Sequence, residues 1–169
     1  DIKNYISTLK ANNYKLAEEI RNINNVGASS VDAYSFIISS LKILHPGISE
    51  TSLKESITDD DDDNQIDAIV IEDDFVNIYD FKMSVGFGEN DIRLFTESTD
   101  EIIFNPDGDL SKSNHLIKKR VPLARQAIEN GNKVRIRVVR GGDNSVYTQG
   151  QEVLEKLVYD SIIEKKLIS

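Results

Sequence analysis

Three charged residues stand at the ends of two apolar segments of the sequence. Asp67 opens the segment 66–71, and Asp80 and Lys82 close the segment 75–83. Side chains alternate along a strand, so Asp80 and Lys82 share a face, about 7 Å apart at a rise of ~3.3 Å per residue. Two carboxylates can hold a divalent cation, and an ammonium beside an attacking water aids its deprotonation and offsets charge on phosphorus. These residue types indicate metal-assisted phosphodiester hydrolysis.

The two segments are predicted to pair as a hairpin. The polar residues 72–74 form a short connection between two strand-like runs, which favours an antiparallel pair. Asp67 and Asp80 are roughly equidistant from this turn, so we expect Asp67 to lie opposite the region of Asp80. The backbone carbonyl of Phe81 is a further hard oxygen ligand at the same place. We therefore expect Asp67, Asp80 and Lys82 to act in catalysis, and Asp67, Asp80 and Phe81 to bind the metal.

The choice of metal follows from the ligands that the chain offers. It has no Cys and only two histidines, His45 and His115, which are far apart in sequence. Thiolate sites and His-rich zinc sites are thereby excluded, so we expect Mg²⁺ or Mn²⁺ on carboxylates. The early helices offer Glu18, Glu19 and Asp32 as further ligands, although ordinary surface acids fit there too. The histidines suit capping or packing roles.

Two other interpretations of the acidic residues stay open at this level. Asp80 and Lys82 could form a plain surface ion pair on an edge strand, with Asp67 ending a turn. Five consecutive carboxylates, residues 59–63, repel one another, so we expect this run to be an exposed, solvated turn.

The elements that must position these residues are read from periodicity and from turn signals. The pattern predicts helices over 2–20, 29–44, 114–129 and 150–167, strands over 66–71, 75–83 and 133–139, and loops with short elements over 84–111. This order predicts a three-layer α/β fold with a small mixed β-sheet flanked by helices. We expect one domain over 1–169, with N-terminal helices at 1–47 and an α/β core at 48–169. The first residue is Asp1 rather than Met, which fits a fragment of a longer protein with further domains.

Charge is distributed unevenly along the chain, whose net charge is -9. Residues 112–140 hold nine Lys and Arg against one acid, a local charge of +8, while residues 1–111 hold eight basic and 23 acidic residues, a local charge of -15. The basic segment predicts phosphate contacts with nucleic acid. The residues expected to make them are Lys118, Lys119, Arg125, Arg135 and Arg137. Solvated helix and strand faces are the alternative, and the acidic part alone would suit a domain that mimics a polyanion or binds basic proteins.

The apolar runs bear on the cellular setting. None approaches the ~20 residues of a membrane span, and no signal-peptide pattern opens the chain. Together with the absence of Cys, this predicts a cytoplasmic protein without membrane contact. The oligomeric state does not follow from the sequence.

Residues 65–71 followed by 77–82 resemble the active-site hairpin of the PD-(D/E)XK nuclease superfamily, at Asp67, Asp80 and Lys82. The longer pattern of apolar helix 33–44, spacer, acidic turn and hairpin resembles the N-terminal region of abortive-infection phage-resistance (AIPR) proteins. The resemblance implies a restriction-endonuclease-like core and a Mg²⁺- or Mn²⁺-dependent nuclease, cutting DNA or RNA in phage defence or restriction.

Departures from the family pattern define the alternatives. Ile66 stands where the superfamily's name has Pro, and the acidic turn lacks the glycines expected of AIPR proteins. The Asp-to-Asp spacing also resembles viral cap-snatching endonuclease domains, which add a His that only His45 could supply here. A nucleic-acid-binding or partner-binding module that kept the fold without catalysis is the remaining alternative.

Overall fold

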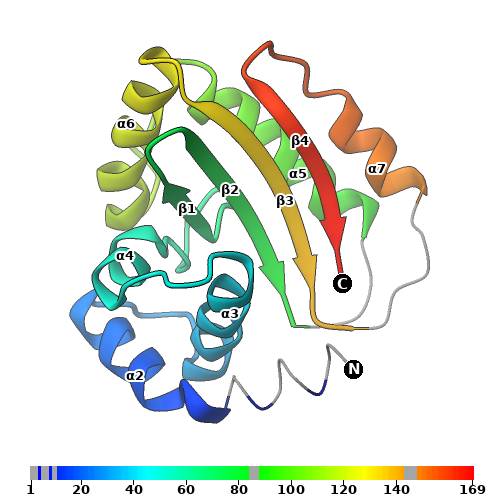
Figure 1. Cartoon of the computed structure of the whole chain (residues 1–169). Helices are drawn as coiled ribbons and strands as arrows, with labels where there is room; N and C mark the ends of the chain where they lie inside the picture. The colour runs from blue at the N-terminus through cyan, green and yellow to red at the C-terminus, as the bar shows by residue number, and fades with distance from the viewer. Residues whose placement is uncertain (1–3, 5–7, 9–10, 84–87, 143–147) are drawn as a thin grey trace.

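The computed structural model describes residues 4, 8, 11–83, 88–142 and 148–169. Its helices are α2 (Tyr14–Ile23), α3 (Val31–Leu44), α4 (Glu50–Ser56), α5 (Glu89–Ser98), the π-helix η1 (Thr99–Ile103), α6 (His115–Glu129) and α7 (Thr148–Glu155). Its strands are β1 (Ala68–Ile71), β2 (Phe75–Lys82), β3 (Lys133–Arg140) and β4 (Ile162–Ile168). Figure 1 shows the four strands side by side with helices before and behind them. The predicted fold class is confirmed: the protein is α/β, with a small mixed sheet flanked by helices.

The sheet has the order β1-β2-β3-β4. β1 and β2 form the predicted antiparallel hairpin, with Ala68 opposite Tyr79 and Ile71 opposite Val76. β3 runs parallel to β2, and β4 runs parallel to β3. A parallel neighbour needs a crossover connection, and α5, η1 and α6 supply the crossover from β2 to β3.

Alternation along β2 divides the core into two clusters. Val76 and Ile78 point to the face that α5, η1, α6 and α7 cover, and they join a cluster of fully buried residues from those helices. Tyr79 and Phe81 point to the other face, which α2, α3 and α4 cover in part. Asp80 and Lys82 therefore belong to the face of the first cluster, since they continue the register of Val76 and Ile78.

Two predicted helices, α3 and α6, agree with the structure in place. Ser30 caps α3 by accepting a hydrogen bond from the Ala33 N–H at 3.0 Å, and Asn114 caps α6 by accepting one from the Ile117 N–H at 2.8 Å. Part of the predicted first helix is found as α2, while residues 1–3, 5–7 and 9–10 lie outside the described residues. Within the described residues, no helix combines the length and apolar character that a membrane span requires.

The prediction of a C-terminal helix over 150–167 is wrong. α7 ends at Glu155, and Ile162–Ile168 form strand β4. Local sequence in this segment is compatible with a helix, but pairing with β3 along six residue pairs stabilises the strand instead. The spacer before the acidic run also contains the unpredicted helix α4, and α5 with η1 replaces most of the expected loop over 84–111.

Candidate metal centre

Asp67 lies directly before β1 and beside the end of β2. Its backbone N–H donates to the Tyr79 carbonyl at 2.9 Å, and its carboxylate Oδ2 accepts the Phe81 N–H at 2.7 Å. The side chain thus replaces a backbone acceptor in the ladder between the two strands. This bond fixes the Asp67 carboxyl against β2, and only 7% of the residue is exposed.

The structure brings Asp67 and Asp80 together. Each carboxyl shifts the pKa of the other, and Asp80 is only 6% exposed. On its other side Asp80 meets the buried guanidinium of Arg140, whose Nη2 donates to Asp80 Oδ2 at 3.0 Å. Arg140 also donates to the carbonyls of Asp80 and Val139. Asp80 is therefore held from two sides, by an acid and by a cation.

Sequence reasoning missed the role of Arg140. Even-numbered residues of β3 are apolar and buried up to Val138, and Arg140 continues that row. A charged residue at an inward-facing strand position implies a buried partner. A charged residue in this apolar row of β3 was the sequence signal for an opposite charge on a neighbouring strand.

The acidic run does not form the expected solvated turn throughout. Asp61 and Asp62 are exposed, but Asp59 and Asp63 turn inward. One carboxylate oxygen each of Asp59, Asp63 and Asp67 lies within 4.8 Å of the other two. Hydrogen bonds from near and distant residues hold the run in this conformation. The Asp63 carboxylate accepts the Gln65 N–H at 2.9 Å, and the Tyr34 hydroxyl donates to the Asp59 carbonyl at 2.6 Å.

Asp60 anchors the same loop from the other side, because its carboxylate accepts the N–H groups of Gly27 and Ala28 at 3.3 and 2.9 Å. Backbone at positive φ in Asp62, Asn64 and Gln65 reverses the chain between the run and β1. Asp and Asn tolerate the left-handed region better than most residues, so the composition of this turn suits its geometry.

Burial and mutual repulsion shift the titration of these carboxyls. Burial, followed by the charges of Asp63, Asp59 and Asp80, raises the pKa of Asp67 well above its usual range. Burial likewise raises the pKa of Asp63 to about 7. Burial also raises the pKa of Asp80, although the Arg140 charge opposes that shift. A bound cation would favour the ionised form of the cluster, because it offsets like charges that burial brings together.

The cluster offers only oxygen ligands, the donor set that Mg²⁺, Mn²⁺ and Ca²⁺ prefer. Asp59, Asp63 and Asp67 have the spacing of ligands to one ion, and Asp80 adjoins Asp67. Of the predicted ligands, Asp67 belongs to this set, Asp80 borders it, and Phe81 contributes the N–H that orients Asp67. A role for the Phe81 carbonyl stays a prediction.

Lys82 lies on the same face of β2 as Asp80, but its ammonium is engaged elsewhere. Nζ lies 2.7 Å from Asp91 Oδ2 at the start of α5, and the side chains are 50% and 39% exposed. The Asp91 charge also raises the pKa of Asp80, so this exposed pair borders the carboxyl cluster. No ion pair found among the described residues joins Lys82 to Asp67 or Asp80.

The five predicted phosphate-contact residues do not share one surface. Lys118 and Lys119 are exposed on α6, but Arg125 is tied to the Ile102 and Gly108 carbonyls at 2.7 and 3.0 Å. Arg135 and Arg137 lie on the opposite face of the sheet from Asp80. Arg125 therefore does not belong with Arg135 and Arg137 to one cationic region.

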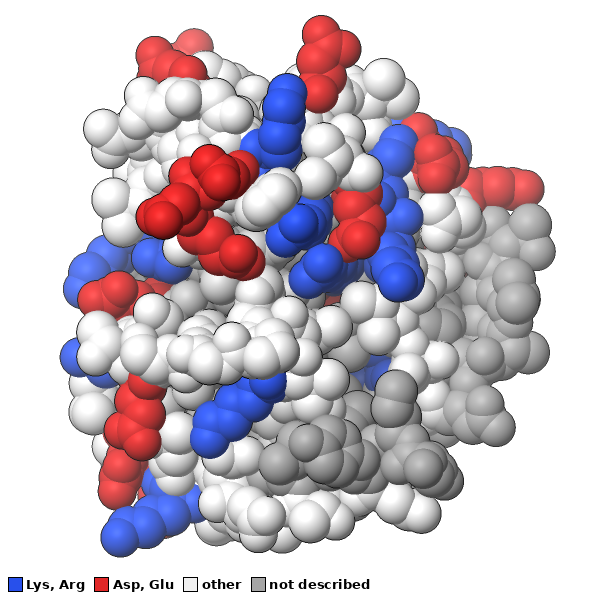
Figure 2. All heavy atoms as spheres, viewed as in Figure 1, with Lys and Arg blue, Asp and Glu red and all other residues white. Residues whose placement is uncertain are grey.

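On that opposite face, acids balance much of the positive charge. Figure 2 shows basic and acidic side chains interleaved over the strands. Arg135 lies over the Phe75 ring at 3.6 Å, and Arg137 pairs with Glu164 at 2.6 Å and donates to the Tyr79 hydroxyl at 2.7 Å. These arginines have structural partners that the sequence did not indicate.

His45 also lies away from the carboxyl cluster. It contacts the Tyr79 hydroxyl at 2.6 Å and Glu72 at 2.9 Å, on the face of the sheet that Asp80 does not occupy. A role as metal ligand beside Asp67, as in the cap-snatching alternative, has no geometric support. The other histidine, His115, has a structural role, since its Nε2 lies in hydrogen-bonding distance of the Asn24 carbonyl, at 2.7 Å.

Comparison of the chain with protein-family models, with curated proteins and with solved structures finds no match.

Proposed function

We propose that this chain is a Mg²⁺- or Mn²⁺-dependent phosphodiester hydrolase that acts on DNA or RNA. The observation that carries the proposal is the cluster of Asp59, Asp63 and Asp67 at the end of the β1–β2 hairpin, where the buried Asp80 also shifts the pKa of Asp67. Burying carboxyls together is costly without a compensating cation, and a cation in that place is what hydrolysis of a phosphodiester requires. Sequence resemblance to the PD-(D/E)XK superfamily supports the same function.

The residues have separable tasks in this proposal. Asp67 and Asp80 would hold the metal with help from Asp59 or Asp63, and the metal would supply an acidified water and neutralise charge on the phosphate. The Phe81 N–H orients Asp67, and Arg140 orients Asp80 and opposes the rise of its pKa that burial causes. Lys82 would hold the attacking water or the phosphate oxygen once the exposed bond to Asp91 exchanges.

Lys118 and Lys119 are the residues that best suit substrate contact away from the metal. Both are exposed on α6. Replacing both with Gln should weaken nucleic-acid binding about equally across sequences and flatten its salt dependence, by roughly one unit of slope for each phosphate group that is no longer bound. Lys54→Gln on α4, also exposed, is the matched control.

The direct test is cleavage of single- and double-stranded DNA and RNA with Mg²⁺, with Mn²⁺ and with EDTA. We expect cleavage of at least one substrate with metal, none with EDTA, and loss of activity in Asp67→Asn and Asp80→Asn. Asp61→Asn, in the same acidic run but exposed, should keep full activity. Absence of cleavage of all four substrates, with metal binding intact, would contradict catalysis.

A metal-binding module without catalysis is the second candidate function. The ion pair between Lys82 and Asp91 favours it, because Lys82 is the one side-chain cation in the proposed mechanism and Asp91 binds it instead. Asp91→Asn separates the two candidates. In an enzyme this change frees Lys82 and leaves or raises the rate, whereas in a binding module no cleavage appears. A role in phage defence or restriction is proposed from the sequence resemblance.

A further inference from the structure

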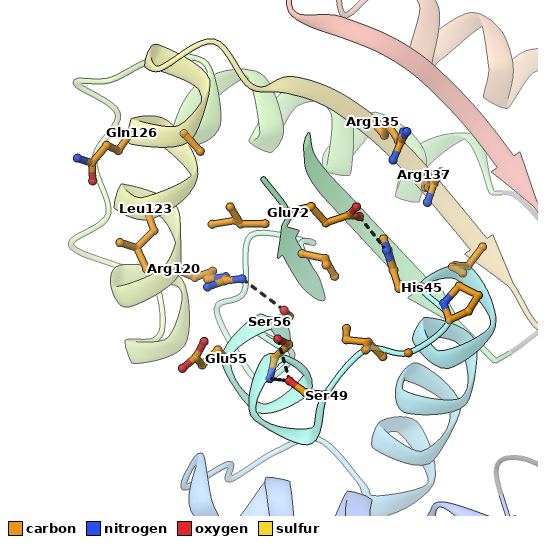
Figure 3. A pocket seen from close by; sticks show the side chains of 18 of the residues that line it. His45, Ser49, Glu55, Ser56, Glu72, Arg120, Leu123, Gln126, Arg135 and Arg137 are labelled. Carbon is orange, nitrogen blue, oxygen red and sulfur yellow. Dashed lines mark hydrogen bonds and ion pairs between the residues drawn. The ribbon is translucent and has the colours of Figure 1, made fainter. Parts of the chain in front are cut away.

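A second polar site is separate from the carboxyl cluster. A cavity of about 860 Å³ opens between the end of α3, α4, β1 and α6, and none of the clustered aspartates lines it. Its volume is within the ~300–1,000 Å³ of ordinary small-molecule sites. Figure 3 shows α6 forming one wall and α4 the lower wall, with β1 and β2 behind. This site is independent of the proposed function.

The cavity has guanidinium groups at two places. Arg120 enters it from α6, while Arg135 and Arg137 reach it from β3 on the far side of β2 (Figure 3). Arginine at a concave surface recognises phosphate or carboxylate through its planar set of N–H donors. The lining also includes Glu55 and Glu72, so it carries three arginines against two acids.

Arg120 is the strongest indication of an anionic ligand. Its Nε donates to the Ile69 carbonyl at 2.9 Å, and Nη2 makes only a long contact of 3.4 Å with the Ser56 hydroxyl. No carboxylate of the described residues forms an ion pair with it, and Glu55 acts on it only at a distance. A half-buried guanidinium with spare donors and no ion pair can accept an anion that enters the cavity.

The rest of the lining indicates what accompanies the anion. Leu123, Val70 and Ile71 supply apolar contacts for an organic body. Glu72 faces the cavity with its carboxylate fixed by the Asn77 amide at 2.8 Å and by His45 at 2.9 Å. A carboxylate held in this way accepts hydrogen bonds from hydroxyl or amino groups of a ligand.

We propose that this cavity binds a small phosphate ester of nucleotide size. Its phosphate contacts Arg120, its body lies along Leu123, Val70 and Ile71, and its hydroxyl or amino groups donate to Glu72. An inorganic anion alone would use only the first of these contacts, and a metal cation would be repelled by the arginines.

Calorimetric titration and thermal shift in EDTA test the proposal, because EDTA keeps the carboxyl cluster out of the measurement. The probes are adenosine 5′-monophosphate, glycerol 3-phosphate, inorganic phosphate, adenosine and a ten-nucleotide single-stranded DNA. We expect saturable binding of adenosine 5′-monophosphate, weaker binding of the other two phosphates, and none of adenosine. Free phosphate binding as tightly as the nucleotide would contradict the contacts proposed for the organic body.

Leu123 provides the matched pair of variants, since it lines the cavity and is 47% exposed, so the fold tolerates a polar residue there. Leu123→Glu places an anion beside the proposed phosphate and should weaken binding about tenfold or more, whereas Leu123→Gln removes only the apolar contact and should weaken binding by clearly less. Glu55→Gln removes an acid from the lining and should tighten binding.

Three further outcomes would overturn the proposal. The first is that no phosphate probe binds saturably up to millimolar concentration. The second is equal affinity of the Leu123→Glu and Leu123→Gln variants. The third is DNA that binds far more tightly than the nucleotide and displaces it. The last result would assign the cavity to a nucleic-acid strand. Circular dichroism of each variant verifies the fold, and unchanged spectra are expected.

Discussion

Arg140 at the end of β3 and Asp80 near the end of β2 form a buried ion pair, with Nη2 and Oδ2 3.0 Å apart and the side chains 0% and 9% exposed. The Asp67 carboxyl also shifts the pKa of Asp80. The pair therefore couples the parallel β2–β3 ladder to the carboxyl cluster, and a change in either residue reaches both stability and metal binding.

Replacing Arg140 with Met should destabilise the fold strongly. The change leaves the Asp80 carboxyl buried without its cation, and breaking a buried ion pair on one side costs about 3–5 kcal/mol. Urea denaturation measures the free energy of unfolding. Lys82→Met is the matched control, since Lys82 lies opposite Arg140 in the register and its ion pair is exposed, so it should cost no more than about 1 kcal/mol. Equal losses in the two variants would contradict the structural role of the buried pair.

Stability without metal should rise as the pH falls from about 7 toward 5, through the carboxyl cluster. The pKa of Asp63 is about 7 in the folded protein and 3.8 as a free side chain, so the folded state binds more protons across that interval. The contribution of protonated Asp63 to the free energy of unfolding is then present at the lower pH and is lost as pH rises through the folded pKa.

Asp63→Asn should flatten that dependence, which thermal unfolding in EDTA at several pH values measures. Burial lowers the pKa of His45, an effect that opposes the trend below pH 6.5, so the difference between parent and variant is the quantity to compare. Asp61→Asn, at an exposed position, is the control. A pH profile identical in the parent and in Asp63→Asn would show that Asp63 titrates normally.

Mn²⁺ should stabilise the folded protein through the same cluster. An ion that binds only the folded state at 100 times its dissociation constant adds about 2.7 kcal/mol to the free energy of unfolding. Asp67→Asn should remove that gain, because Asp67 adjoins Asp59, Asp63 and Asp80. Asp61→Asn should retain it. Thermal shift against Mn²⁺ concentration distinguishes them, and a gain that survives in Asp67→Asn would place the metal elsewhere.

Lys82→Ala should abolish turnover while metal and substrate binding persist. The ammonium acts mainly in the transition state, and removing one such electrostatic interaction lowers the rate on the order of 100- to 1000-fold. Single-turnover cleavage, with affinity measured separately, gives both quantities. Lys82→Arg keeps the charge and should recover part of the rate. Cleavage by Lys82→Ala at the parent's rate would leave Lys82 as a partner of Asp91 alone.

The sequence by itself determined the hairpin and the pairing of its acids. Alternation placed Asp80 on the inward face of β2, and the short turn at 72–74 set the register that carries Asp67 to its side. Both follow from local rules, a two-residue period and a tight connection, and local rules are readable from the order of residues.

Only the tertiary structure decided which other charges meet that pair. Asp59 and Asp63 lie inward in a loop that is tied to distant residues, because the Asp60 carboxylate accepts the Ala28 N–H and the Asp59 carbonyl accepts the Tyr34 hydroxyl. No local pattern in five identical residues distinguishes Asp59 and Asp63 from the others. Arg140 reaches Asp80 through parallel strand pairing sixty residues along the chain.

The same holds for the basic segment and the C-terminus. From composition, Arg125, Arg135 and Arg137 belong to one basic segment. In the structure, Arg125 lies on α6 and contacts η1, whereas Arg135 and Arg137 lie on β3. Ile162–Ile168 became a strand because β3 offers it an edge. Non-local pairing outweighs the weak local preferences of such segments, so the fold, and not the sequence pattern, determines where their charges lie.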